Sequence, residues 1–428
     1  MTTPAAEDYE LSFAQQRLWF ADQLAPGSPA YNMYEAYRLR GPLDLGALRT
    51  AIADTVTRHE TLRTTFHARR GVPYQVIGAA AVGLAEVAEV TGLETAVRRP
   101  FALDREPPLR MSLLRQGDDD HALLAVVHHI VSDERSMSVF WHDLCAHYRA
   151  RTTGTAPTLA PLPVRYVDYA AWQRDWLSGD VLADELDHWR RELKGAPLVL
   201  ELPADRPRPA RQTDAHGVVP FRLPPEVVAG VHATARAAGA TPFMTLLAAF
   251  AALLAKATGR DDVIIGTFAA NRTIVEVEDI AGLFVNTLPL RVRLGGDPAF
   301  ERLLQTVRLA ATDGIRHQEV PFDQVVTALR PPRDLSRNPV AQVAFQAMEP
   351  AGDRVRLPGI AATPHAIGQC GDPFDVRVAM RDQDGELHYA ADLFSEASAR
   401  SLAEWFTRIV TAVADRPSVR LTQLPDQP

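Results

Sequence analysis

The chain has 428 residues, and its 45 lysines and arginines against 53 aspartates and glutamates give a formal net charge of −8. At roughly 100–200 residues per domain, this length predicts two domains or one two-lobed unit. The hydrophobic content of 46% is enough for a packed core and excludes a disordered or collagen-like chain. The acidic balance argues against nucleic-acid binding, which needs a basic footprint. Two cysteines without Cys-x-x-Cys spacing exclude a disulfide scaffold and fit a reducing, cytoplasmic compartment.

Helix and strand patterns alternate along the chain, which predicts an α/β protein with mixed layers. The first helix is predicted in LSFAQQRLWFADQL, where Ser12 and Gln15 have the spacing of a capping box. Further along, we predict a helix in LDLGALRTAIADTVTRH and a hairpin with a Gly-Val-Pro turn in TLRTTFHARRGVPYQVIG. A buried strand is then predicted in HALLAVVHHIV, followed by a helix in SMSVFWHDLCAHYRAR.

The second half begins with a helix predicted at about 182–194, so we place the lobe boundary near residue 178, between lobes of residues 1–178 and 179–428. TPFMTLLAAFAALLAKATG is predicted to be a buried helix capped by Thr241 and ended by Gly259. Its apolar run is shorter than the ~18 residues of a membrane span, so no membrane association is expected. A strand is predicted in DDVIIGTF, and helices in AFERLLQTVRLAATDGI and SARSLAEWFTRIVTAVAD. The acidic start MTTPAAEDYE does not resemble a secretory signal.

The segment VVHHIVSDERS is the best candidate for chemistry, because a buried strand runs directly into His128 and His129 and then to Asp133. Histidine takes or gives a proton near neutrality, since its unperturbed pKa is about 6.5. Asp133 is interpreted as an orienting residue or an ion-pair partner, because a second base would compete for the same proton. A packed histidine pair without catalysis explains the same spacing. Nearby histidines lack ligand spacing, so no metal site is predicted.

HHIVSDE resembles the HHxxxDG signature of condensation domains of nonribosomal peptide synthetases. Six further segments resemble the family's other motifs in the same order: LSFAQQRLWF, RHETLRTTF, YVDYAAWQR, IGTFAANRTIVEVEDIAGLFVNTLPLR, HQEVPFDQVV and RDLSRNPVAQVAFQ. Because the resemblance covers nearly the whole chain, the protein is identified as a member of this family. The implied fold is two chloramphenicol-acetyltransferase-like lobes in a V, with the active site at their junction.

The resemblance implies a role for each matching residue. His129 would be catalytic and His128 mainly structural, while Asp133 would form a salt bridge across the lobes to Arg272. Arg63 would also be structural. The implied reaction is amide-bond formation between a donor thioester and an acceptor aminoacyl thioester, both carried on phosphopantetheine arms.

The same resemblance implies donor and acceptor peptidyl carrier proteins as partners, with neighbouring adenylation and carrier domains and no bound cofactor. The chain is expected to be a cytoplasmic monomer that acts in the biosynthesis of an antibiotic or siderophore. The opening segment LSFAQQRLWFADQLAPGSPAYN is similar to the branch that accepts an L-configured donor. Nothing in the sequence separates amide from ester formation, so an ester-forming enzyme is an alternative. The sequence determines neither donor, acceptor nor final product.

One position departs from the signature, because Glu134 stands where the family has a glycine. Three interpretations stay open. Glu134 is an acidic first-turn residue favoured by the helix dipole, or it narrows or charges the substrate pocket. In the third interpretation it marks a catalytically silent recruitment domain of the same superfamily, which would bind carrier proteins or a tailoring enzyme.

Overall fold

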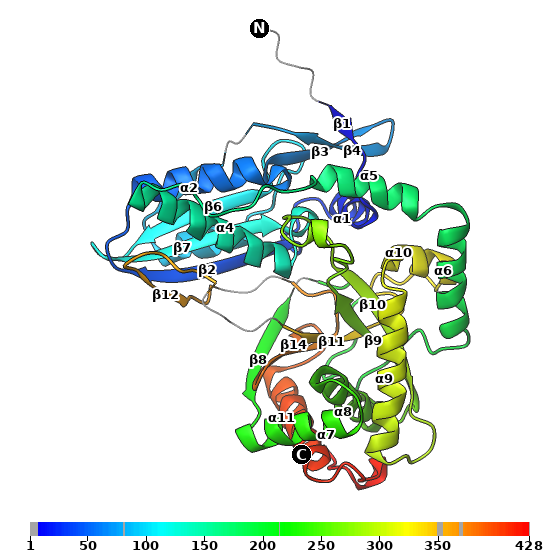
Figure 1. Cartoon of the computed structure of the whole chain (residues 1–428). Helices are drawn as coiled ribbons and strands as arrows, with labels where there is room; N and C mark the ends of the chain where they lie inside the picture. Colours follow the sequence, from blue (N-terminus) through cyan, green and yellow to red (C-terminus); the bar gives the residue numbers. More distant parts are fainter. Residues whose placement is uncertain (1–6, 80–81, 214, 349–353, 368–370, 428) are drawn as a thin grey trace. The chain divides into compact units, whose positions relative to one another are not determined.

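The computed structural model describes residues 7–79, 82–213, 215–348, 354–367 and 371–427 (Figure 1). Contacts within the chain divide it into two compact units. Unit 1 comprises Met1–Ser178, Ala270–Val285 and Gly352–Cys370, and unit 2 comprises Gly179–Ala269, Asn286–Ala351 and Gly371–Pro428. The chain leaves unit 1 after Ser178 and returns to it twice, so two later segments make their contacts in unit 1 and not in the lobe that follows residue 178.

Unit 1 is built on a five-stranded sheet in the order β12-β2-β7-β6-β5, and a second sheet has the order β1-β4-β3. Neighbours in the larger sheet are antiparallel except β5 and β6. The strands are β1 (Asp8–Tyr9), β2 (Asn32–Arg40), β3 (Thr64–Arg69), β4 (Val72–Ile77), β5 (Leu84–Val87), β6 (Leu109–Arg115), β7 (Asp120–His128) and β12 (Ala361–Pro364). The helices are α1 (Phe13–Leu24), α2 (Leu45–Arg58), η1 (Glu60–Arg63), α3 (Val90–Arg98), η2 (His129–Val131), α4 (Glu134–Thr153), α5 (Tyr166–Trp176) and η3 (Val275–Val277).

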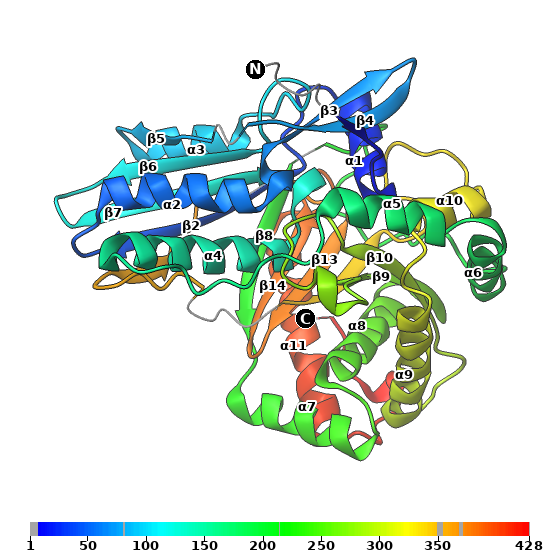
Figure 2. The same cartoon turned by 45° about the horizontal axis from the view of Figure 1, so that its top comes forward.

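Helices contact both faces of the larger sheet. Side chains alternate between the two faces along β2, so residues of this strand show one contact on each face. On one face the ring of Tyr37 packs against Trp141 of α4, with the ring centroids 5.1 Å apart. On the other face the side-chain amide of Asn32 donates to the carbonyl of Val97 in α3 (2.7 Å). Figure 2 shows α2 and α4 side by side over the sheet. The central strand β7 is buried from its second residue onward, as HALLAVVHHIV predicts, and its carboxyl end carries the two histidines.

Unit 2 is a six-stranded mixed sheet in the order β10-β9-β11-β13-β14-β8, in which β11 runs parallel to β9 and β13. Its helices share one hydrophobic core with this sheet. The strands are β8 (His216–Arg222), β9 (Asp262–Ala269), β10 (Asn286–Arg293), β11 (Val343–Ala347), β13 (Val376–Arg381) and β14 (Asp384–Ala390). The helices are α6 (Gly179–Glu192), α7 (Pro225–Ala237), α8 (Pro242–Thr258), α9 (Phe300–Arg316), α10 (Phe322–Leu329), α11 (Glu396–Asp415) and η4 (Leu421–Gln423).

Capping signals in the sequence set the helix ends. Ser12 and Gln15 form the predicted capping box at the start of α1. Thr241 caps α8 by accepting from the backbone N–H of Met244, and α8 ends at Gly259 in the left-handed conformation. Within the described residues, no single helix is long and apolar enough to cross a membrane. The helices α7 and α8 meet that criterion only as a pair, with a bend of 103° between them.

The predicted hairpin forms between β3 and β4, but its turn lies elsewhere. Arg69 pairs with Val72, so the turn consists of Arg70 and Gly71. Both have positive φ, 54° and 80°, which is the type I′ conformation whose twist matches the flanking strands. The predicted Gly-Val-Pro turn is therefore wrong. Pro73 belongs to β4, because the preceding glycine already satisfies the need for positive φ.

Candidate functional site

His128, the last residue of β7, is built into the core of unit 1. It is 3% exposed, and its Nδ1 accepts a hydrogen bond from the backbone N–H of Ile130 (3.1 Å). The rings of Phe101 and Tyr31 lie with centroids 6.0 and 6.1 Å from it. Burial lowers the pKa of His128 to about 3, so the ring is neutral at pH 7. These are the contacts of a packing residue.

His129, the next residue, begins η2 and is only partly buried. Its ring Nδ1 lies 2.6 Å from the carbonyl oxygen of Ser132. A carbonyl only accepts hydrogen bonds, so the proton resides on Nδ1, and Nε2 keeps a lone pair. Burial lowers the pKa of His129, and the charge of Arg17 in α1 lowers it further. Within the ranges that the structure describes, nothing hydrogen-bonds Nε2, which makes it the available basic nitrogen.

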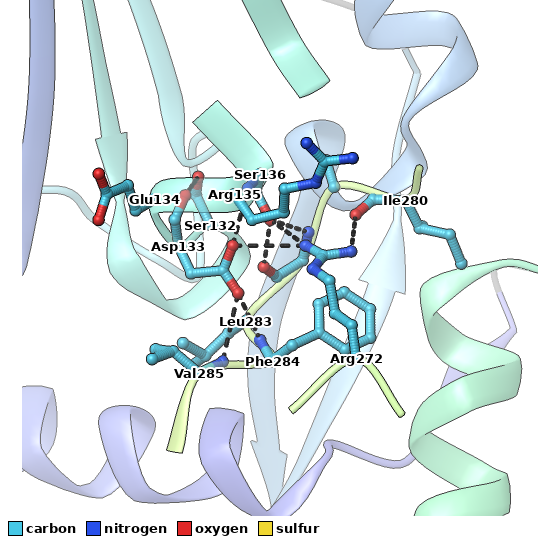
Figure 3. Close-up of polar contacts among 12 residues, drawn as sticks. Ser132, Asp133, Glu134, Arg135, Ser136, Arg272, Ile280, Leu283, Phe284 and Val285 are labelled. Carbon is cyan, nitrogen blue, oxygen red and sulfur yellow. Dashed lines mark hydrogen bonds and ion pairs between the residues drawn. The ribbon is translucent and has the colours of Figure 1, made fainter. Parts of the chain in front are cut away.

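Asp133 caps α4 and has all its acceptor positions in use. Its Oδ1 accepts from the backbone N–H of Ser136 (2.8 Å) and lies 3.3 Å from Nη2 of Arg272. Its Oδ2 accepts from the backbone N–H groups of Phe284 (3.0 Å) and Val285 (3.2 Å), as Figure 3 shows. With four donors around it, the carboxylate is an organising group rather than an available base.

Arg272 completes the ion pair from a later segment of the chain. The side chains of Asp133 and Arg272 are 4% and 5% exposed. The guanidinium also donates to the hydroxyl of Ser136 (2.8 Å) and lies 4.0 Å above the ring of Phe284. The pair that the resemblance implied is thus present, but it lies within unit 1 and not across two lobes. The reason is that Ala270–Val285 folds against the start of α4.

A second set of contacts joins this segment to α1 and α5. The hydroxyl of Tyr166 donates to the carbonyl of Leu283 (2.6 Å) and lies 2.9 Å from the hydroxyl of Ser12. A Cβ atom on Gly282 would lie 2.0 Å from the Tyr166 ring, so only glycine fits there. Tyr166 and Gly282 lie inside two of the matched motifs, but neither residue stands out in the sequence. A tyrosine opposite a glycine is visible only after folding.

Arg63 does not join this network among the described contacts. It lies at the end of η1, donates to a nearby backbone carbonyl, and pairs with Glu60 at 3.2 Å. From the same motif it is Thr61 that reaches Ala270–Val285, where its hydroxyl donates to the carbonyl of Ala281 (2.9 Å). The described contacts of Arg63 are therefore local, and its structural role at the active site stays a prediction.

Glu134 is the first residue of α4, and its carboxylate points away from the Asp133–Arg272 pair (Figure 3). Its Oε1 lies 3.3 Å from Nη2 of Arg354, whose Nη1 lies 2.6 Å from Oε1 of Glu35 on β2. The three side chains are 29%, 13% and 22% exposed, in the order Glu134, Arg354, Glu35. Glu134 is thus a first-turn residue and a member of an ion cluster. No sequence signal reveals this cluster, because Arg354 is 220 positions away.

Comparison with known proteins identifies the family. The model of the condensation domain family matches residues 5–426. The chain is 40% identical to a linear gramicidin synthase of Brevibacillus parabrevis, over 99% of this chain and 6% of that protein. It is 38% identical to phosphinothricin tripeptide synthetase PhsC of Streptomyces viridochromogenes, over 97% of this chain and 40% of that protein. The chain belongs to the condensation domain family, and it spans a small part of the synthetases that it matches.

Solved structures identify the fold. The X-domain from teicoplanin biosynthesis superposes with a TM-score of 0.89 at 32% identity and covers 100% of this chain and 99% of that one. The same values of TM-score and identity hold for the complex of the X-domain and OxyB, with 99% and 97% coverage. The condensation domain of the monacolin K polyketide synthase MokA superposes with a TM-score of 0.86 at 23% identity, over 97% and 99%. The mixed α/β architecture is therefore the chloramphenicol-acetyltransferase-like fold of condensation domains.

Proposed function

We propose that this chain is an active condensation domain, which joins a donor acyl or peptidyl thioester to the amine of an acceptor aminoacyl thioester. The observation that carries the proposal is the orientation of His129, whose Nδ1 is held by the carbonyl of Ser132 at 2.6 Å. This contact leaves Nε2 as a basic nitrogen, and the lowered pKa keeps the ring neutral at pH 7. A neutral, oriented imidazole is suited to accept a proton from an attacking amine.

The reaction needs no nucleophilic residue, because condensation domains act on thioesters that phosphopantetheine arms deliver. The acceptor nitrogen attacks the thioester carbonyl carbon and forms the C–N bond. The C–S bond then breaks, and the proton that the nitrogen loses is transferred to the departing thiolate, which leaves as a thiol. Alignment of two tethered reactants can be worth an effective molarity on the order of 10⁵ M. His129 serves this reaction either as the base or as a positioner of the tetrahedral intermediate.

The other predicted site residues receive structural roles in this proposal. His128 packs the end of β7, and the Asp133–Arg272 pair holds Ala270–Val285 against the start of α4. Arg63 supports its own turn. In this proposal only His129 takes part in the reaction. The charged residues around it have structural roles, because most of their donors and acceptors are hydrogen-bonded to each other.

For Glu134 we favour the first of the three interpretations. An acidic residue in the first turn of α4 is stabilised by the helix dipole, and the contact with Arg354 gives its carboxylate a partner. The charge of Glu134 is thereby partly compensated within unit 1, by an arginine that it shares with Glu35. This pairing weakens the case for a negatively charged group that alters the substrate pocket.

We propose donor and acceptor peptidyl carrier proteins as the partners, together with adjoining adenylation and carrier domains in a cytoplasmic synthetase. The two synthetases named above are relatives of which this chain spans 6% and 40%, which supports such neighbours. The similarity of LSFAQQRLWFADQLAPGSPAYN to one branch of the family supports an L-configured donor. We treat the domain as a monomeric unit within that assembly.

A second candidate function is recruitment without catalysis. The observation that favours it is the similarity at 32% identity to the X-domain, which a solved complex shows together with OxyB. The glutamate that follows Asp133 agrees with this interpretation, whereas the retention of both His128 and His129 favours catalysis. In the recruitment function, the domain would bind an oxidative tailoring enzyme or a carrier protein.

The test is a condensation assay with loaded donor and acceptor carrier proteins. We compare the wild type with His129→Ala and with His232→Ala, an exposed histidine on α7 that serves as the matched control. Loss of a general base or positioner is expected to lower the rate about 10²–10⁴-fold, and the control is expected to match the wild type. Acceptor arms that carry a hydroxyl in place of the amine measure ester formation.

An equal rate in His129→Ala and the wild type would overturn the assignment of His129. If the wild type forms no product with any donor and acceptor pair, yet binds an oxidative enzyme, the recruitment function replaces catalysis. A pull-down with a tailoring oxygenase separates these two results.

A further inference from the structure

Unit 2 contains a cluster of titratable side chains that the proposed reaction does not use. It lies where α6 runs beside the C-terminal end of α9 (Figures 1 and 2). Glu185 and His188 come from α6, and Asp313 and His317 come from the last turn and the C-cap of α9. The spacings i, i+3 and i, i+4 place each pair on one side of its helix. Two helices therefore present two carboxylates and two imidazoles to each other.

Three side chains of the cluster lie close enough together to bind one metal ion. One ligand atom each from His188, Asp313 and His317 lie within 4.8 Å of one another. The Nε2 atom of His188 lies 3.4 Å from Oδ2 of Asp313. Two imidazoles and one carboxylate, with a fourth position open to water, form a common ligand set for Zn²⁺.

The two histidines differ in their hydrogen bonding. The Nε2 atom of His188 is buried and has no hydrogen-bond partner among the described residues. The Nδ1 atom of His317 lies 2.9 Å from Oε2 of Glu185. This contact leaves Nε2 of His317 as the nitrogen that can bind a metal ion. A carboxylate that holds the distal N–H of a metal-binding histidine is the usual outer partner of such ligands. The backbone of His317 is also held, because the indole N–H of Trp189 donates to its carbonyl (3.2 Å).

The two rings are stacked, with centroids 3.5 Å apart and an angle of 14° between their planes. Lone pairs in parallel planes do not converge, so metal binding requires the imidazoles to tilt apart about χ2. His188 and His317 are 15% and 27% exposed, and Asp313 is 44% exposed. The cluster is therefore open to solvent on one side, from which an ion can enter.

We propose that His188, Asp313 and His317 bind a zinc-type divalent transition-metal ion, with Glu185 as the outer partner of His317. Zinc bound there ties α6 to α9 within unit 2. The site is independent of the condensation reaction. The sequence predicted no metal because these ligands lie on two helices far apart in the chain.

The test is isothermal titration of the full chain with ZnCl₂, after removal of any affinity tag. The wild type is expected to bind one zinc ion per chain. His188→Ala and Asp313→Asn are expected to lose at least about 10-fold in affinity, and Glu185→Gln about 10-fold, as for other outer partners. His232→Ala, on α7 of the same unit, is the matched control and is expected to bind like the wild type.

Asp313→Asn keeps the proposal testable if the alanine variant at His188 fails to fold, because Asp313 is only partly buried and Asn preserves its size. Titration with Co²⁺ gives a second measurement, since a tetrahedral site with nitrogen ligands produces visible absorption bands. Zinc binding that is absent from the wild type, or equal in the wild type and in Asp313→Asn, would overturn the proposal.

Discussion

The two histidine pairs of this protein are assembled in opposite ways. His128 and His129 are neighbours in the sequence, yet they enter different environments: one ring is packed against Phe101, and the other is held by Ser132. His188 and His317 come from two helices far apart in the chain, yet their rings are stacked at 3.5 Å. The direction of each side chain at the end of β7 separates the first pair, and helix packing joins the second.

The two regions also differ in how many of their polar groups have hydrogen-bond partners. Around Asp133, beside the first pair, four donors satisfy both carboxylate oxygens, so the position of the carboxylate is fixed before any substrate binds. Only Nε of Arg272 is left without a hydrogen-bond partner among the described atoms of this network. Around the second pair, the buried Nε2 of His188 is left without a hydrogen-bond partner in the described part of the chain. A satisfied network suits a positioning role, whereas an unsatisfied one suits a ligand that arrives later.

The largest expected effect on stability comes from Asp133, which lies beside the first histidine pair. Asp133→Ala removes the N-cap of α4 and leaves the buried charge of Arg272 and two backbone N–H groups without this acceptor. We expect a loss of about 3–5 kcal/mol in the free energy of unfolding of unit 1. Urea unfolding combined with hydrogen exchange at the amides of α4 measures it.

A matched control for this loss is Glu396→Gln in α11, which breaks an exposed pair with Arg400. Such pairs contribute less than about 0.5 kcal/mol. Equal losses in the two variants would show that the Asp133 network is no more stabilising than a surface ion pair, and the contrast between the two histidine regions would not hold.

The next effect concerns how the free energy of unfolding changes as the pH is lowered. The pKa of His128 is about 3 in the folded chain against about 6.5 when unfolded. The unfolded chain therefore binds an extra proton between these values, and stability is lost as the pH falls from 6.5 toward 3. The expected slope is up to about 1.4 kcal/mol per pH unit.

His128→Asn is the comparison for this slope, because its side-chain oxygen can still accept from the N–H of Ile130. We expect the urea midpoint of the variant to fall less steeply with acid than that of the wild type. His129 is present in both proteins, so its own lowered pKa cancels in the difference. Identical pH slopes would contradict the buried, neutral state of His128.

The smallest expected effect belongs to the ion cluster of Glu134. Arg354→Gln leaves both Glu35 and Glu134 without this partner, whereas Glu134→Gln leaves the closer Glu35 contact intact. We expect a loss of about 1–2 kcal/mol for the arginine variant and about 0.5 kcal/mol for the glutamine at 134. A double-mutant cycle on thermal unfolding measures the coupling between the two residues.

The same variants test the interpretation of Glu134. If Glu134 is only a first-turn residue that pairs with Arg354, Glu134→Gln and Glu134→Gly keep the condensation rate and acceptor range of the wild type. A change in acceptor range would favour the interpretation in which Glu134 alters the substrate pocket.

Much of the fold could be predicted from the sequence because its signals are local. Capping at Ser12 and Thr241, the apolar run of β7 and the helical stripe of α11 each act within a few residues. The turn of the β3–β4 hairpin is the exception. The proline at 73 suggests a turn in the sequence, whereas Arg70 and Gly71 supply the positive φ values that the hairpin needs.

For the candidate site, the residue types, their order and the family follow from the amino-acid sequence alone. It placed two histidines at the end of a buried strand and an aspartate at the start of a helix. Three contacts became visible only in the folded chain: Asp133 meets Arg272 within unit 1, Glu134 pairs with Arg354, and His188 stacks on His317. Periodicity and capping act over one or two turns, whereas ion pairs and clusters depend on which distant segments pack together, and a single sequence carries no direct record of that packing.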